Sequence, residues 1–109
     1  MTTKNLIDRT TLARELDNPR LVLLEALPQS YYAQGHLPGA RWFPHERAKE
    51  LAAVAAPRKD DPIVVYCASN TCQNSHVAAK ALVDLGYTQV RVYAGGKADW
   101  QDAGLPLEA

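Results

Sequence analysis

The sequence contains little cysteine and no excess of charge of either sign, and each absence excludes a class of protein. Only 2 of its 109 residues are cysteines, Cys67 and Cys72, too few for a small domain held together by several disulfides. We therefore expect free thiols in the reducing cytoplasm. The 12 basic and 12 acidic residues give a formal net charge of zero. No general electrostatic attraction to nucleic acid or to an anionic membrane is expected.

Long hydrophobic segments are also missing. The longest apolar runs, residues 21–24 and 63–66, have the length of strands, and the first residues lack the apolar core of a secretory signal. Hydrophobic residues make up 47% and charged residues 22% of the chain, proportions typical of folded globular proteins and not of disordered or fibrous ones. A chain of this length supports one hydrophobic core, so we expect a single domain over residues 1–109.

Strand-like and helix-like patterns alternate along the chain. The strand-like runs share unbroken apolarity, which indicates burial on both faces of a parallel sheet; they lie at residues 21–25, 63–67 and 90–93. The helical patterns lie at residues 11–16, 45–56 and 75–85. Thr10 or Thr11 is the expected cap of the first helix. This order predicts an α/β sandwich, and the mixed charges of residues 57–62, between two prolines, predict a solvated surface loop.

The segment after the second predicted strand is the candidate for chemistry. The strand ends at Cys67, a polar loop follows, and a helix begins near Ser75. Cys67 should therefore lie at the carboxyl end of the sheet, where open α/β sheets bind ligands. Free N–H groups of the helix start and of a curled loop would attract an anion and lower the pKa of the Cys67 thiol. Two interpretations stay open, a reactive thiolate or a small buried hydrophobic residue.

Four short motifs follow one another along the chain. Residues 23–27 read Leu-Leu-Glu-Ala-Leu, residues 35–40 read Gly-His-Leu-Pro-Gly-Ala, residues 65–67 read Val-Tyr-Cys, and residues 92–107 contain Gly-Gly, a tryptophan and Ala-Gly-Leu-Pro. Together and in this order they resemble the rhodanese-like domain family over nearly the whole chain. The resemblance implies a three-layer α/β/α sandwich around a central, mostly parallel sheet of roughly five strands.

Three residue types within these motifs have structural interpretations. Trp100 is expected to anchor the core under the last helix, because single tryptophans in small domains mostly bury area. His36 is expected to hydrogen-bond backbone groups in its turn. Gly95 and Gly96 would let the chain reverse before that last helix.

The resemblance also implies an activity, sulfur transfer. A cysteine thiolate would take a sulfane sulfur from a donor, as a small sulfur-containing anion such as thiosulfate or as a persulfide, and pass it to a thiol or protein acceptor. By position Cys67 would be the carrier. The substrate cradle would be formed by Ala68, Ser69, Asn70, Thr71, Cys72, Gln73 and Asn74. Backbone N–H groups would stabilise the persulfide, so neither a metal nor an organic cofactor is expected.

The loop departs from the usual pattern of the family. It is about two residues longer, and Asn74 stands where the family often has an arginine. None of residues 68–74 is charged, so thiosulfate would be held without charge-assisted hydrogen bonds and weakly. The missing arginine also disfavours phosphatase or arsenate reductase chemistry. Leu27 replaces the arginine usual two residues after the acidic position, which leaves Glu25 to find other partners.

Cys72 has two interpretations that the residues leave open. It lies in the same loop as Cys67 and could act as a resolving thiol that releases the sulfur and leaves a disulfide, or it could fill a small gap beneath the loop. A metal site of Cys67, Cys72 and His76 lacks a clear fourth ligand. The alternative to an enzyme is a catalytically weak module that binds a partner protein or senses oxidants through Cys67 and Cys72.

Overall fold

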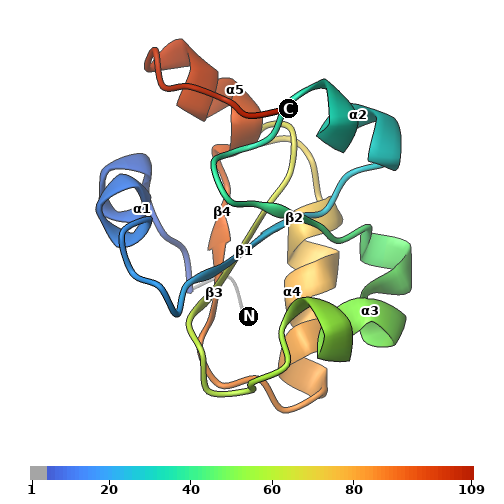
Figure 1. Cartoon of the computed structure of the whole chain (residues 1–109). Coiled ribbons are helices and arrows are strands. Elements are labelled where there is room, and N and C mark those ends of the chain that lie inside the picture. Colours follow the sequence, from blue (N-terminus) through green and yellow to red (C-terminus); the bar gives the residue numbers. More distant parts are fainter. Residues whose placement is uncertain (1–4) are drawn as a thin grey trace.

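A parallel sheet flanked by helices on both faces forms the centre of the molecule (Figure 1). The structure is a computed structural model, and it describes residues 5–109. Within these residues the sheet order is β2-β1-β3-β4, every pair being parallel; the strands are β1 (Val22–Glu25), β2 (Arg41–Trp42), β3 (Ile63–Tyr66) and β4 (Val90–Tyr93). The predicted α/β sandwich with a parallel sheet is confirmed.

The sheet has four strands, where roughly five were expected. Beside β4 the chain makes one isolated parallel bridge between Leu6 and Val92, with the N–H of Ile7 donating to the carbonyl of Val92 at 3.0 Å. The chain then leaves the edge, because Asp8 caps helix α1 (Arg9–Glu15) by accepting from the N–H of Thr11 at 2.8 Å. The predicted cap at Thr10 or Thr11 is therefore wrong, and the early helix start limits the pairing to one bridge.

The helices agree with the sequence patterns where those patterns are long. The remaining ones are α2 (Gln29–Gln34), α3 (Ala48–Ala55), α4 (Asn74–Asp84) and α5 (Gly96–Asp102), with a 3-10 turn, η1 (His45–Arg47), before α3. The helices predicted at residues 11–16 and 75–85 are found within two residues of these bounds, whereas the one predicted at 45–56 begins three residues late, because residues 45–47 form the tighter turn. Helix α2 and strand β2 were not predicted. They have only six and two residues, respectively, and segments this short show too little hydrophobic periodicity to be recognised. No helix in the described part of the chain is long and apolar enough to span a membrane.

Two hydrophobic clusters lie on opposite faces of the sheet. Leu24 and Val65 face α3 and α4, where they pack with Leu82, whereas their neighbours Leu23 and Val64 belong to the cluster on the α1 and α5 face. All four residues of β1 and all four of β3 are buried. Burial on both faces, expected from the unbroken apolar runs, is confirmed.

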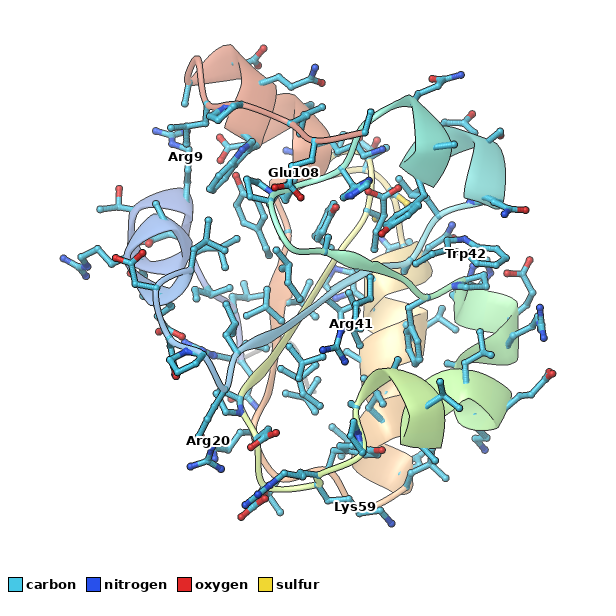
Figure 2. All side chains as sticks on the ribbon, viewed as in Figure 1. Arg9, Arg20, Arg41, Trp42, Lys59 and Glu108 are labelled. Atoms are coloured by element: carbon cyan, nitrogen blue, oxygen red, sulfur yellow. The ribbon has the colours of Figure 1, made fainter. Side chains whose placement is uncertain are left out.

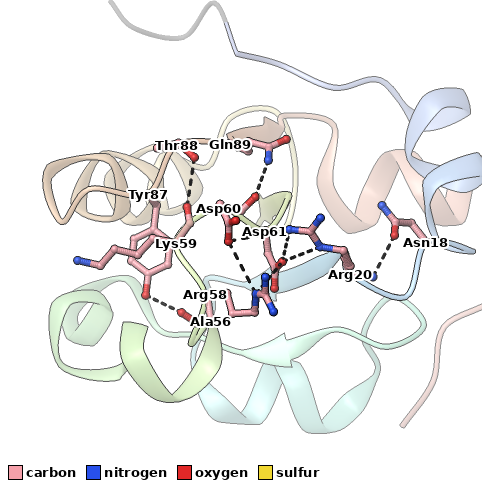
Figure 3. A network of polar contacts seen from close by, with 10 residues as sticks. All are labelled: Asn18, Arg20, Ala56, Arg58, Lys59, Asp60, Asp61, Tyr87, Thr88 and Gln89. Carbon is pink, nitrogen blue, oxygen red and sulfur yellow. Dashed lines mark hydrogen bonds and ion pairs between the residues drawn. The ribbon is translucent and has the colours of Figure 1, made fainter.

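The charged loop at residues 57–62 is only partly solvated. Asp61 is 8% exposed, and its carboxylate accepts from Nε of Arg20 at 2.9 Å while Arg58 lies 3.6 Å away (Figure 3). Behind it the hydroxyl of Tyr87 donates to the carbonyl of Ala56 at 2.6 Å. The prediction of a solvated loop is wrong at Asp61, because that carboxylate ties the segment before β3 to the segment before β1.

Trp100 anchors α5, as predicted. It is 2% exposed, its ring meets that of Tyr93 edge to face with centroids 6.3 Å apart, and its Nε1–H donates to the carbonyl of Pro106 at 2.9 Å. The hydrogen bond satisfies the polar end of a side chain that otherwise fills the core.

We expect Trp100→Ala to lower the free energy of unfolding by about 3–5 kcal/mol, because the change leaves a cavity in this cluster. Val54→Ala is the control; Val54 is 81% exposed, and its truncation should change stability by less than about 0.5 kcal/mol. Urea titrations of both variants measure the difference. A loss below about 1 kcal/mol for Trp100→Ala would contradict the anchoring role.

Candidate active site

Cys67 lies at the carboxyl edge of the sheet, at the start of the loop that connects β3 to α4 (Figure 1). Strand β3 ends one residue earlier, at Tyr66, and α4 begins at Asn74. Helices α2 and α5 are drawn at the same end of the sheet (Figure 1). The position expected for the cysteine from the sequence is the one observed.

The sulfur of Cys67 is enclosed by its own loop. The residue is 1% exposed, and its Sγ donates to the carbonyl oxygen of Cys72 at 3.4 Å. The hydroxyl oxygen of Ser75, in the first turn of α4, lies 3.5 Å from the same Sγ. The thiol therefore faces a hydrogen-bond acceptor on one side and a hydroxyl group on the other.

Burial raises the pKa of the Cys67 thiol, and the side chain of Cys72 acts in the same direction. The hydroxyl and the backbone N–H of Ser75 oppose this shift. The predicted lowering of the pKa is therefore wrong for this arrangement of the loop. Burial outweighs the contribution of Ser75. The carbonyl oxygen of Cys72 contacts the sulfur, and the N–H of Cys72 is directed to the carbonyl of Ser69 at 3.1 Å.

The seven residues predicted to form the cradle make up one loop with a range of exposure. Asn70, Thr71 and Gln73 are exposed, whereas Ala68, Ser69, Cys72 and Asn74 are half-buried. Within residues 5–109 the sulfur makes polar contacts with Cys72 and Ser75. The cradle of N–H groups stays a prediction.

Ser75 is the contact that sequence reasoning missed. The helical pattern predicts only that a helix begins near this residue, although a hydroxyl residue in a first helical turn that faces a strand end is a signal for such a contact.

The second cysteine is half-buried, and both cysteines are free thiols. A role for Cys72 as a resolving thiol stays a prediction. Among the residues that the structure describes, no group of three or more His, Cys, Asp or Glu side chains is arranged to hold a metal ion. Cys67, Cys72 and His76 thus do not form the three-ligand cluster considered above.

The first turn of α5 forms the floor of the loop. The N–H of Lys97 donates to the carbonyl of Cys67, and that of Ala98 donates to the carbonyl of Ala68, both at 2.9 Å. Gly96 has φ +66°, and a Cβ at this position would lie 2.3 Å from the carbonyl oxygen of Cys67. A side chain cannot fit there, so the predicted chain reversal at Gly95 and Gly96 also brings two backbone segments into contact.

Glu25, the last residue of β1, is fully buried beside this floor. Its Oε1 accepts from the hydroxyl of Tyr66 at 2.6 Å, and its Oε2 lies 3.0 Å from Nζ of Lys97. Burial and this hydrogen bond raise the pKa of Tyr66 well above its usual value. Leu27 occupies the position where the family usually has an arginine, and Lys97 is the basic residue that pairs with Glu25 instead.

The turn at residues 35–40 is held from both sides. The His36 ring stacks on Tyr32 with centroids 3.9 Å apart, and its Nδ1 lies 2.9 Å from the carbonyl oxygen of Tyr32. On the other side a carboxylate oxygen of Glu108 accepts from the N–H of Gly39 at 2.9 Å; Figure 2 shows this side chain near the top of the molecule. The backbone contact expected for His36 is confirmed.

Residues 8–103 match the rhodanese-like domain family, and the chain belongs to it. A thiosulfate sulfurtransferase, PspE of Escherichia coli, is 41% identical over 68 residues, which are 62% of this chain and 62% of PspE. The HTH-type transcriptional regulator Rv0324 of Mycobacterium tuberculosis is 31% identical over 106 residues, which are 96% of this chain and 45% of the regulator. The chain therefore spans less than two thirds of the length of these two relatives.

The fold is shared with a solved structure. The rhodanese-like domain of the Alr3790 protein from Anabaena superposes with a TM-score of 0.85 at 28% identity, over 97% of this chain and 80% of that one. The family resemblance read from the four motifs is confirmed, together with the layered fold that it implied.

We expect Gly96→Ala to destabilise the protein more than Gly104→Ala. Both glycines have positive φ, +66° and +78°, but a Cβ at Gly104 would meet no atom within 4 Å. Gly104→Ala should lower the free energy of unfolding by about 1–2 kcal/mol, and Gly96→Ala by about 1–3 kcal/mol more. Chemical denaturation measures both, and equal losses would contradict the close approach to Cys67.

The raised pKa of Cys67 predicts a pH-dependent stability. The folded state holds the thiol proton more tightly than the unfolded chain, whose thiol loses it near pH 8.5. The stabilising contribution is thus complete below about pH 8.5 and is lost as the pH rises through the folded pKa. The free energy of unfolding should fall over this interval more in the natural protein than in Cys67→Ser. Urea titrations at several pH values test this; a parallel pH dependence in both proteins would refute it.

Proposed function

We propose that the protein is a sulfurtransferase that carries sulfane sulfur on Cys67. The observation that supports this most directly is a buried cysteine at the carboxyl end of β3 in a chain of the rhodanese-like domain family. The relative PspE, 41% identical over its matched part, is named a thiosulfate sulfurtransferase. Two free thiols also favour a reducing compartment such as the cytoplasm.

Two displacements complete the reaction. The Cys67 thiolate attacks the outer sulfur of the donor, which forms an S–S bond and releases the rest of the donor with its electron pair, as sulfite when the donor is thiosulfate. An acceptor thiolate then attacks the outer sulfur of the persulfide, and the Cys67 thiolate leaves. Oxidation state and charge balance over the two steps, so no external oxidant is needed.

The thiol must first lose its proton and become accessible. A thiolate cannot donate to the carbonyl of Cys72, so the 3.4 Å contact holds only the protonated form. Because Cys67 is 1% exposed, the loop at residues 68–74 has to move before a donor can reach the sulfur. In the moved loop, backbone N–H groups and the hydroxyl of Ser75 would stabilise the anion.

The donor class follows from the charge of the loop. None of residues 68–74 is charged, so an anion would be bound through N–H groups and neutral side chains alone. A persulfide on a thiol carries less charge than thiosulfate and loses less from the absence of a cation. We propose a persulfide donor over thiosulfate, with a thiol or protein acceptor.

A second candidate function is a binding or redox-sensing module. The likeness to Rv0324, whose name is that of a transcriptional regulator, favours it, as do two free cysteines in one loop. In this case a peroxide would accept two electrons from Cys67 and Cys72, and their two thiols would become a disulfide while the peroxide is reduced to water or an alcohol.

Intact mass spectrometry separates the two candidates. After incubation with a sulfane donor, we expect one added sulfur that cyanide removes and that Cys67→Ser never acquires. A persulfide of a small thiol should load the protein at lower concentration than thiosulfate does. If no donor adds sulfur and mild peroxide readily forms the disulfide between Cys67 and Cys72, the sulfurtransferase proposal fails and the sensor is favoured.

Cys72→Ser provides the matched test of the resolving thiol. A variant that turns over at the natural rate with an added thiol acceptor would remove Cys72 from the reaction and leave Cys67 as the carrier. If loading is normal and sulfur release slows at least tenfold, Cys72 takes part in the second displacement.

A further inference from the structure

Beneath the loop of Cys67 lies an ion pair that is largely withheld from water. Glu25 is 0% exposed and the side chain of Lys97 is 12% exposed, with Nζ and Oε2 3.0 Å apart. Burial of two charges is unfavourable unless further polar contacts satisfy them. A pair in this position therefore needs an explanation other than simple stabilisation.

Further contacts make the pair a junction of several segments. The hydroxyl of Tyr66 donates to Oε1 of Glu25 at 2.6 Å and accepts from the N–H of Leu37 at 3.0 Å. On the other side, Nζ of Lys97 donates to the carbonyl of Tyr31, in α2, at 2.8 Å. The ammonium of Lys97 is thus fixed to the ends of β1 and β3 and to α2.

The backbone of the same lysine holds the reactive residue. The N–H groups of Lys97 and Ala98 donate to the carbonyls of Cys67 and Ala68 at 2.9 Å. Contacts inside the loop, such as that of the Cys72 N–H with the Ser69 carbonyl, join loop residues to one another and do not attach them to the sheet. Beyond the end of β3 at Tyr66, the first turn of α5 therefore holds the carbonyl groups of Cys67 and Ala68.

We propose that Lys97 is a positioning residue for Cys67: its ammonium, held by Glu25, fixes the first turn of α5, whose N–H groups fix the backbone of Cys67 and Ala68. The inference rests on the proposed function of Cys67 as the sulfur carrier. In-line attack on a donor sulfur depends on the placement of Sγ, and a displacement of about 1 Å can slow such a step about a hundredfold.

Two variants separate positioning from stability. Lys97→Met alone leaves the Glu25 carboxylate buried without its cation, so it should destabilise the protein and is uninformative if it does not fold. The double variant E25Q/K97M removes both charges and with them this penalty. Lys80→Met is the matched control, because Lys80 is 77% exposed and pairs with Asp84 on the surface of α4.

Amide hydrogen exchange of E25Q/K97M reports the backbone contacts directly. We expect the exchange of the Ala98 amide, corrected for its intrinsic rate, to rise at least tenfold, while that of Val64, in the middle of β3, stays within threefold. Lys80→Met should change neither. Unchanged exchange at Ala98, or an equal rise at Val64, would overturn the positioning role, because the first means that the contact needs no ion pair and the second that the whole fold is weakened.

Single-turnover loading of Cys67 from a small-thiol persulfide is the second readout. In E25Q/K97M we expect the limiting rate at saturating donor to fall at least tenfold and the donor concentration for half-maximal rate to change less than threefold. A natural limiting rate in this variant would overturn the proposal. If the natural protein accepts no sulfur from any donor, the proposed function fails; the limiting rate of Cys67 alkylation by iodoacetamide then takes the place of loading, with the same expected decrease.

Discussion

Burial of β1 and β3 on both faces is the constraint on which the rest of the structure depends. All eight residues of the two strands are buried, and their parallel register sets Glu25 beside Tyr66 at the carboxyl end. Cys67 follows directly after Tyr66, so this cysteine and an acidic residue lie at the same edge of the sheet. Because Glu25, Tyr66 and Cys67 are buried at this edge, their polar atoms need hydrogen-bond or ion-pair partners within the protein.

Glu25 and Cys67 have different partners: a hydroxyl and an ammonium group lie beside the carboxylate, and a carbonyl group lies beside the thiol. Oε1 of Glu25 accepts a hydrogen bond from the hydroxyl of Tyr66, whereas its buried Oε2 accepts no hydrogen bond from the described residues and has the ammonium of Lys97 at 3.0 Å as its ion-pair partner. Cys67 is satisfied as a neutral thiol by the carbonyl of Cys72. Below the loop the contacts thus join an acidic and a basic side chain, whereas within the loop they involve a neutral thiol. The proposed sulfur transfer would require the loop to move while the contacts of Glu25 and Lys97 stay in place.

Much of the fold could be predicted from local patterns. The apolar runs at β1, β3 and β4 and the long periodicity of α4 locate these elements within one or two residues, because the pattern of burial is repeated within each segment. Helix α2 and strand β2 are too short to carry such a pattern. The cap of α1 was predicted wrongly at Thr10 or Thr11, since the side chain of Asp8, which caps the helix, accepts hydrogen bonds as theirs do.

The site was predictable in its position and not in its contacts. The end of an apolar run located Cys67, and the order of four motifs indicated the family. The neutral loop of residues 68–74 was also visible in the sequence. The direction of the Cys67 pKa shift was predicted wrongly, because burial of the thiol raises the pKa more than the hydroxyl and N–H of Ser75 lower it.

The sequence by itself determined the alternation of strands and helices, the place of Cys67 at a strand end and the absence of charge in the loop after it. Only the tertiary structure decided that Lys97 pairs with Glu25, that Ser75 reaches the sulfur and that Gly96 packs against the Cys67 backbone. The physical reason is that periodicity and composition belong to one segment of the chain. A buried charge or thiol is completed by whichever distant segment the packing brings beside it.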